Sequence, residues 1–112
     1  MKKDYSDYLD DIINAITKAE QFIGKMSFED FEQDEKTIFA VVRALEIIGE
    51  ATKKLPESLK NKYPKIPWRE ISGMRNKLIH EYFGVNLRVV WDTVKKDIPR
   101  IKLLFQEIIK KK

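Results

Sequence analysis

Cysteine is absent from this 112-residue sequence, and histidine occurs only once, at His80. Without cysteine the chain can form neither a disulfide nor a thiolate site, and one histidine alone is a weak metal-ligand set, so we expect no metal. Apolar runs are also short: no stretch approaches the ~20 residues that a membrane-spanning helix needs. Residues 1–10 are too charged for a signal peptide. We therefore expect a cytoplasmic protein without a membrane partner.

Glycine and proline are scarce, with four of each, and most of them fall between segments of helical periodicity. No internal repeat, low-complexity tract or linker divides the sequence, so we expect one domain over residues 1–112. Hydrophobic residues make up 43% and charged residues 36% of the chain, which is typical of a folded protein with a very polar surface. The net charge of +4 permits nucleic-acid binding without demonstrating it.

Apolar residues spaced three and four apart predict a first amphipathic helix from about Asp4 to Ile23. Gly24 should end it, because glycine adopts the left-handed conformation cheaply. A second helix is expected from Phe31 or Glu35 to Lys54, and its wide apolar arc is typical of a central or interface helix. Ser27 and Asp30 form a candidate capping box before it, with Asp30 and Asp34 as rival caps.

Prolines bracket the next region, where we expect a short helix around Glu57 to Lys62. A third long helix is predicted from about Trp68 to Tyr82, ending before Gly84. Pro67 has the backbone angle favoured at the first turn of a helix. Trp68 and Trp91 are interpreted as core or interface residues, because tryptophan buries a large area.

The last helix should run from about Leu87 to Lys110, with Asn86 as its cap. Pro99 falls inside this pattern and should kink or split the helix, since proline removes one hydrogen bond and crowds the preceding turn. No segment alternates with period two for long enough to predict a strand. The sequence therefore predicts an all-α, up-and-down bundle of four long helices plus a short one.

The candidate chemistry lies around His80, because histidine is the side chain best suited to proton transfer near neutral pH. Asn76 is four residues before His80 and shares its helix face. Arg75 is five residues before it, so the two side chains point about 140° apart on an ideal helix. The long arginine could curl into the same pocket, or a partner subunit could build a composite site. A structural role is the alternative for a lone histidine on a helix.

The functional interpretation is cleavage of an RNA phosphodiester bond. Arg75 would hold the scissile phosphate and stabilise the charge that builds on its oxygens. His80 would be the general base or acid for an attacking ribose 2′-hydroxyl, which makes this RNA chemistry. Asn76 could orient the phosphate or the imidazole, and Lys77 is a possible contact to the RNA backbone. This scheme needs no metal and no cofactor.

The same residues carry a family resemblance. Arg75, four residues, His80, one residue and Tyr82 match the motif of the HepT-like branch of the HEPN superfamily. The similarity continues through much of the chain, in Arg43–Ala51, Leu55–Pro56, Pro67–Ile71, Gly73–His80, Tyr82–Val85 and Val90–Trp91. The sequence thus resembles HEPN ribonuclease toxins over nearly its whole length.

The resemblance implies a HEPN-like helical homodimer with both arginine–histidine pairs lining a cleft at the interface. It implies metal-independent endoribonuclease activity on tRNA or mRNA, as the toxin of a type II-like HEPN/MNT toxin–antitoxin system. The antitoxin would be a separate MNT-type nucleotidyltransferase that can transfer AMP onto the motif tyrosine, here Tyr82. Phosphates added there would occupy the site beside Arg75 and neutralise its charge.

Two other classes of function remain open. The chain could be a catalytically inactive module that binds nucleotides or RNA in the same cleft, or a structural partner subunit of a nucleotidyltransferase. Arg43, Glu46 and Glu50 stand at helix-neighbour spacings. We interpret the two glutamates as a solvated or ion-paired face, with lining of the cleft as the alternative.

Overall fold

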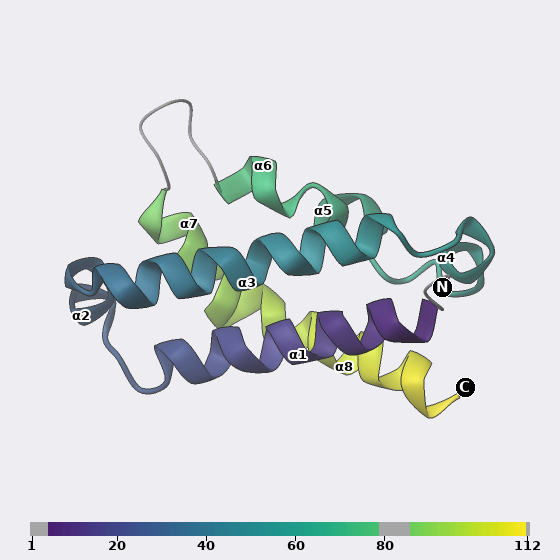
Figure 1. The fold of residues 1–112 in the computed structure, drawn as a ribbon, viewed down its shortest axis with the longest axis horizontal. Helices are drawn as coiled ribbons and strands as arrows, with labels where there is room; N and C mark the ends of the chain where they lie inside the picture. The colour runs from purple at the N-terminus through teal and green to yellow at the C-terminus, as the bar shows by residue number, and fades with distance from the viewer. Residues whose placement is uncertain (1–4, 79–85, 112) are drawn as a thin grey trace.

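A computed structural model describes residues 5–78 and 86–111. In these ranges the secondary structure is entirely helical, which confirms the predicted all-α class. The helices are α1 (Tyr5–Ile23), α2 (Phe28–Gln33), α3 (Glu35–Lys53), α4 (Glu57–Lys62), α5 (Trp68–Ser72), α6 (Met74–Leu78), α7 (Leu87–Asp92) and α8 (Ile98–Lys110), as Figure 1 shows. None of these described helices has both the length and the apolar character needed to cross a bilayer.

Helices α1 and α3 form the central antiparallel pair, and they lie side by side along most of their length (Figure 1). Helix α8 packs against α1, and its Phe105 ring meets Trp68 at the start of α5. The fully buried side chains at the centre come from all three helices and include Leu9, Ile12, Ile16, Leu45, Ile48, Ile98 and Phe105. This core holds the outer short helices in place by burying their apolar residues, such as Ile71 of α5.

The turn between α1 and α3 follows the predicted local signals. Gly24 takes the left-handed conformation at φ 52° directly after α1 ends. The Ser27 side chain accepts a hydrogen bond from the Asp30 amide, and Asp34 accepts one from the Thr37 amide. Two of the three candidates are used, because two helices start here: Ser27 caps α2 and Asp34 caps α3, while Asp30 lies inside α2 and is the N-cap of neither helix. The amide of Thr37 also lowers the pKa of the Asp34 carboxyl.

The prediction of one continuous third long helix from Trp68 to Tyr82 is wrong. The described part is two short helices, α5 and α6, separated at Gly73. The amide of Asn76 donates to the Gly73 carbonyl, three residues back, so the hydrogen bonding at the junction follows the tighter 3₁₀ pattern. The part of the prediction beyond Leu78, including the end before Gly84, lies outside the described residues.

The final helix changes its hydrogen bonding just before Pro99. Residues Thr93–Asp97 form a π-helical turn between α7 and α8, and the Ile98 amide donates to the Thr93 carbonyl five residues back. Pro99 then stands in the first turn of α8, where its missing N–H costs least. A change of helix type thus precedes Pro99, while the predicted kink or split of the helix stays a prediction. Asn86 caps α7 as predicted, accepting from the Val89 amide.

Candidate active site

Arg75 is the sequence-predicted catalytic residue whose surroundings the structure describes. It lies in the short helix α6, and its side chain is 60% exposed. Its Nε donates to Oε2 of Glu46 on α3 at 3.0 Å. No other group in residues 5–78 and 86–111 forms a hydrogen bond with this guanidinium. Among the described residues, one edge of the guanidinium is therefore held by Glu46, and its terminal nitrogens form no hydrogen bond.

Glu46 belongs to a charged row along the exposed side of α3. Arg43 Nη1 lies 3.8 Å from Glu46 Oε1 and donates to Glu50 Oε1 at 3.2 Å. The predicted ion-paired face of this helix is thus confirmed. The sequence did not reveal the partner across 29 residues, because the spacing of Arg43, Glu46 and Glu50 indicates only neighbours on one helix. The contact between Glu46 and Arg75 depends on the packing of α6 against α3, and the sequence contains no signal for that packing.

The remaining predicted site residues are only partly within the described structure. Asn76 follows Arg75 in α6 and is exposed, so the two motif residues lie together on one short helix. Lys77 is in the same helix, but the position of its side chain is outside the description. His80 and Tyr82 lie outside the described residues, so the arrangement of Arg75 with His80 stays a prediction.

Close packing of α5 and α6 on α3 sets the position of Arg75. Ile71 and Met74, which flank Gly73, are both buried. Gly49 of α3 faces this junction: a Cβ there would lie 3.3 Å from the Ile71 carbonyl oxygen and 3.4 Å from that of Ser72. A side chain at position 49 would push the junction outward. The glycine therefore allows α6 to approach α3 closely enough for Arg75 to reach Glu46.

Gly49→Val should lower the free energy of unfolding by about 1–3 kcal/mol, the usual cost of adding carbons to a well-packed contact. Urea denaturation followed by circular dichroism measures this. Lys53→Val, on an exposed position of the same helix, is the matched control for the helix propensity of valine and should change stability by less than about 0.5 kcal/mol. A Gly49→Val variant as stable as the wild type would contradict the close approach.

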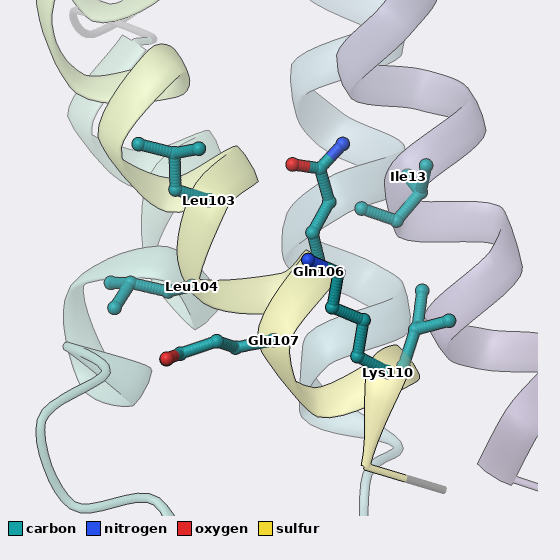
Figure 2. A pocket seen from close by; sticks show the side chains of 7 residues that line it. Ile13, Leu103, Leu104, Gln106, Glu107 and Lys110 are labelled. Carbon is teal, nitrogen blue, oxygen red and sulfur yellow. The ribbon is translucent and has the colours of Figure 1, made fainter.

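Two apolar grooves lie away from Arg75. One, of about 730 Å³, lies between α1 and α8 and is lined by Ile13, Leu103, Leu104, Gln106, Glu107, Ile109 and Lys110 (Figure 2). It contains no arginine or histidine, so we do not assign the chemistry to it. The second, of about 530 Å³, lies between α1 and α3, and its lining includes Phe22, Ala40, Arg43 and Ile47. Through Arg43 this second groove borders the charged row of Glu46.

Metal-ligating side chains do not cluster in the part of the chain that is described: no three His, Cys, Asp or Glu residues there are placed to hold an ion. The charged groups that surround Arg75 are Glu46 and, through it, Arg43. The chemistry that this arrangement offers is anion binding by a fixed, solvent-accessible guanidinium.

Comparison with known proteins identifies the family of the chain. The family model described as "Ribonuclease HepT-like" matches residues 12–108. The chain is 56% identical over 110 residues to "Probable ribonuclease HepT" of Thermococcus cleftensis, covering 98% of this chain and 100% of the relative. It is 50% identical over 107 residues to "Putative RNase MJ1216" of Methanocaldococcus jannaschii, covering 96% and 83%. No solved structure matches. Because the family model spans most of the chain, and the relatives are similar over nearly their full length, the chain belongs to the HepT-like ribonuclease family.

Proposed function

We propose that this protein is a metal-independent endoribonuclease that uses Arg75 and His80. The observation that carries the proposal is the exposed guanidinium of Arg75, fixed at one edge by Glu46 and five residues before the only histidine of the chain. Membership of a family named for ribonucleases supports the same reaction class. A fixed cation with free donors suits a phosphodiester, whose charge increases in the transition state.

The proposed reaction is attack of a ribose 2′-hydroxyl on the adjacent phosphorus. His80 takes the proton from the 2′-oxygen as that oxygen bonds to phosphorus, and the bond to the 5′-oxygen of the next nucleotide breaks. The leaving oxygen takes up a proton, which gives a 2′,3′-cyclic phosphate and a 5′-hydroxyl. Arg75 stabilises the negative charge on the non-bridging oxygens, and Asn76 and Lys77 help to hold the RNA backbone.

We also propose that the enzyme is a toxin held in check by an MNT-type nucleotidyltransferase antitoxin. In this step the Tyr82 hydroxyl attacks the α-phosphorus of ATP, AMP is joined to the tyrosine oxygen and pyrophosphate leaves. The added phosphate brings negative charge close to Arg75 in the sequence. The exposure of Arg75 supports this regulation, since a covalently attached anion could compete with RNA for an accessible guanidinium.

Incubation of purified protein with total RNA in EDTA tests the proposed activity, with mapping of the cut ends to distinguish internal cleavage from trimming. Intact-mass measurement beforehand shows whether the chain carries added AMP, which would mask activity. Internal cuts in EDTA by unmodified protein are the expected result. Unmodified, folded protein that binds RNA and never cuts it would contradict the proposal and favour a binding module instead.

We propose, further, that the active form is a homodimer that uses the α1–α3 side. Phe39 is 70% exposed on α3, one helical turn before Arg43 and on the same side as Glu46. The adjacent groove between α1 and α3 is lined by apolar residues, among them Phe22, Ala40 and Ile47, together with the polar Asp11, Asn14, Lys18 and Arg43. A dimer across this face would cover Phe39 and bring the two copies of Arg75 toward a common cleft.

Phe39→Ala should raise the dissociation constant of that dimer by about tenfold or more, because truncation of a buried aromatic anchor costs above 1 kcal/mol. Light scattering over a concentration series measures the change. Leu103→Ala, an exposed apolar residue on α8, is the matched control and should leave the constant unchanged. A wild type that is monomeric at micromolar concentration would refute the composite cleft.

A further inference from the structure

We infer that Glu46 is a positioning residue for the cleavage reaction: it holds Arg75 by the Nε edge so that the two terminal nitrogens face the scissile phosphate. The inference rests on the proposed function. It differs from the interpretation of Glu46 as part of a solvated, ion-paired face, because it predicts an effect on turnover that a surface ion pair would not have.

The geometry of the contact divides the guanidinium into two parts. Its donors form a planar fork, and an oxyanion can bind either at the Nε side or at the two terminal nitrogens. Oε2 of Glu46 occupies the Nε side at 3.0 Å. Among the described residues the terminal pair has no partner and is left for a phosphate, and its direction follows from the plane of the guanidinium that Glu46 holds.

The two side chains differ in how firmly they are held. Glu46 is 20% exposed and stands in the middle of α3, a helix of 19 residues packed along α1. Arg75 is 60% exposed and stands in α6, a helix of five residues. The long, packed helix thus supplies the anchor, and the exposed arginine is the side chain whose freedom the contact removes. A group held by a packed support is positioned more accurately than one held by its own short helix.

Arg43 lies on the other side of the carboxylate. Its Nη1 lies 3.8 Å from Oε1 of Glu46, so the two carboxylate oxygens face two different guanidinium groups. Arg43 is itself 60% exposed and donates its hydrogen bond to Glu50 at 3.2 Å, which leaves the row of two arginines and two glutamates without net charge. The direct contact of Glu46 with Arg75 is therefore the one that positions the guanidinium.

A competing role for Glu46 would give the opposite effect on the rate of cleavage. If the carboxylate merely blocked the phosphate site, removing its charge would speed the reaction. The Nε contact favours positioning, because among the described residues it leaves open the terminal pair, one of the two edges at which a phosphate can bind. Removing the charge of Glu46 also makes the surface more positive, so RNA binding should not weaken even as turnover falls.

The experiment compares wild type, Glu46→Gln, Glu46→Ala and Glu50→Gln by steady-state cleavage of one short RNA. We expect Glu46→Ala to lower kcat by about 10- to 100-fold, because small misplacement of a catalytic group is costly. Glu46→Gln keeps an oxygen acceptor for Nε and should retain an intermediate kcat. In both variants KM should stay equal or fall. Glu50→Gln, one turn along the same helix and paired only with Arg43 among the described residues, should stay within about twofold of wild type.

A second measurement is independent of turnover. The Nε–Hε signal of Arg75 in a ¹H–¹⁵N spectrum, assigned by its loss in Arg75→Lys, should shift in both Glu46 variants and stay in place in Glu50→Gln. If Glu46→Ala does not fold, Glu46→Gln carries the test, because it preserves size and shape. Glu46 variants with wild-type or higher kcat would overturn the inference alone, as would an unshifted signal. A wild type that cuts no RNA would overturn the proposed function and the inference together.

Discussion

Arg75→Ala and His80→Ala should each lower the rate of RNA cleavage by about 100- to 10,000-fold. The range follows from the usual contribution of one general acid–base group and of one donor to the transition-state oxyanion. Arg75 offers an exposed guanidinium already fixed at its Nε edge, so its removal deletes both the charge and the fork. Single-turnover cleavage of a short RNA measures the chemical step without product release.

Further variants separate the role of the planar guanidinium donors of Arg75 from that of its positive charge. Arg75→Lys keeps a cation but loses the planar donors, so it should recover little of the rate. The double variant of Arg75 and His80 should be about as slow as the slower single variant, because residues that act as one unit are not additive. Arg69→Ala, on the exposed surface of α5, is the matched control for lost positive charge and should remain within about threefold of wild type. Equal losses in Arg69→Ala and Arg75→Ala would show that only charge matters.

Phe105→Ala should lower the free energy of unfolding by about 3–5 kcal/mol, the cost of truncating a buried phenylalanine. Phe105 is fully buried on α8, and its ring meets the edge of Trp68 at 5.7 Å between centroids. Trp68 starts α5, and its indole nitrogen donates to the carbonyls of Lys60 and Tyr63. A domain of this size is stable by only about 5–15 kcal/mol, so the loss is a large share of the total.

Leu103→Ala is the matched control for this prediction, since Leu103 stands two residues earlier on α8 and is 67% exposed. Its truncation should change stability by less than about 0.5 kcal/mol. Denaturant titrations of both variants give the comparison. Equal stabilities would mean that the ring of Phe105 does not anchor α5, and the structural account of how Arg75 is positioned would lose its support on that side.

Local signals in the sequence were sufficient wherever the structure depends on neighbouring residues. The end of α1 at Gly24 and the caps at Ser27, Asp34 and Asn86 all involve groups within four residues of one another. Trp68 also packs against the core, as predicted, although it is only partly buried: its indole meets Phe105 and uses its N–H. These features follow from backbone preference and side-chain size, which a sequence displays directly.

Tertiary contacts explain what the sequence did not predict. Residues Trp68–Leu78 have a helical pattern throughout, and the break at Gly73 occurs where the chain packs against Gly49. The link from Glu46 to Arg75 likewise joins two helices 29 residues apart, which no periodicity can indicate. The motif singles out Arg75 and Asn76 in the sequence, while the contact of Arg75 with Glu46 could be found only in the folded chain.

The most direct test of the central claim is cleavage, in EDTA, of one RNA and of the same sequence with every ribose 2′-O-methylated. The account predicts cuts in the unmodified RNA that leave 2′,3′-cyclic phosphate ends, and no cuts in the methylated strand, because its 2′-oxygen cannot act as the nucleophile. The His80→Ala variant should cleave neither the unmodified nor the methylated RNA. Cleavage of the methylated strand at a similar rate would contradict the mechanism, since the nucleophile would then come from elsewhere than the RNA.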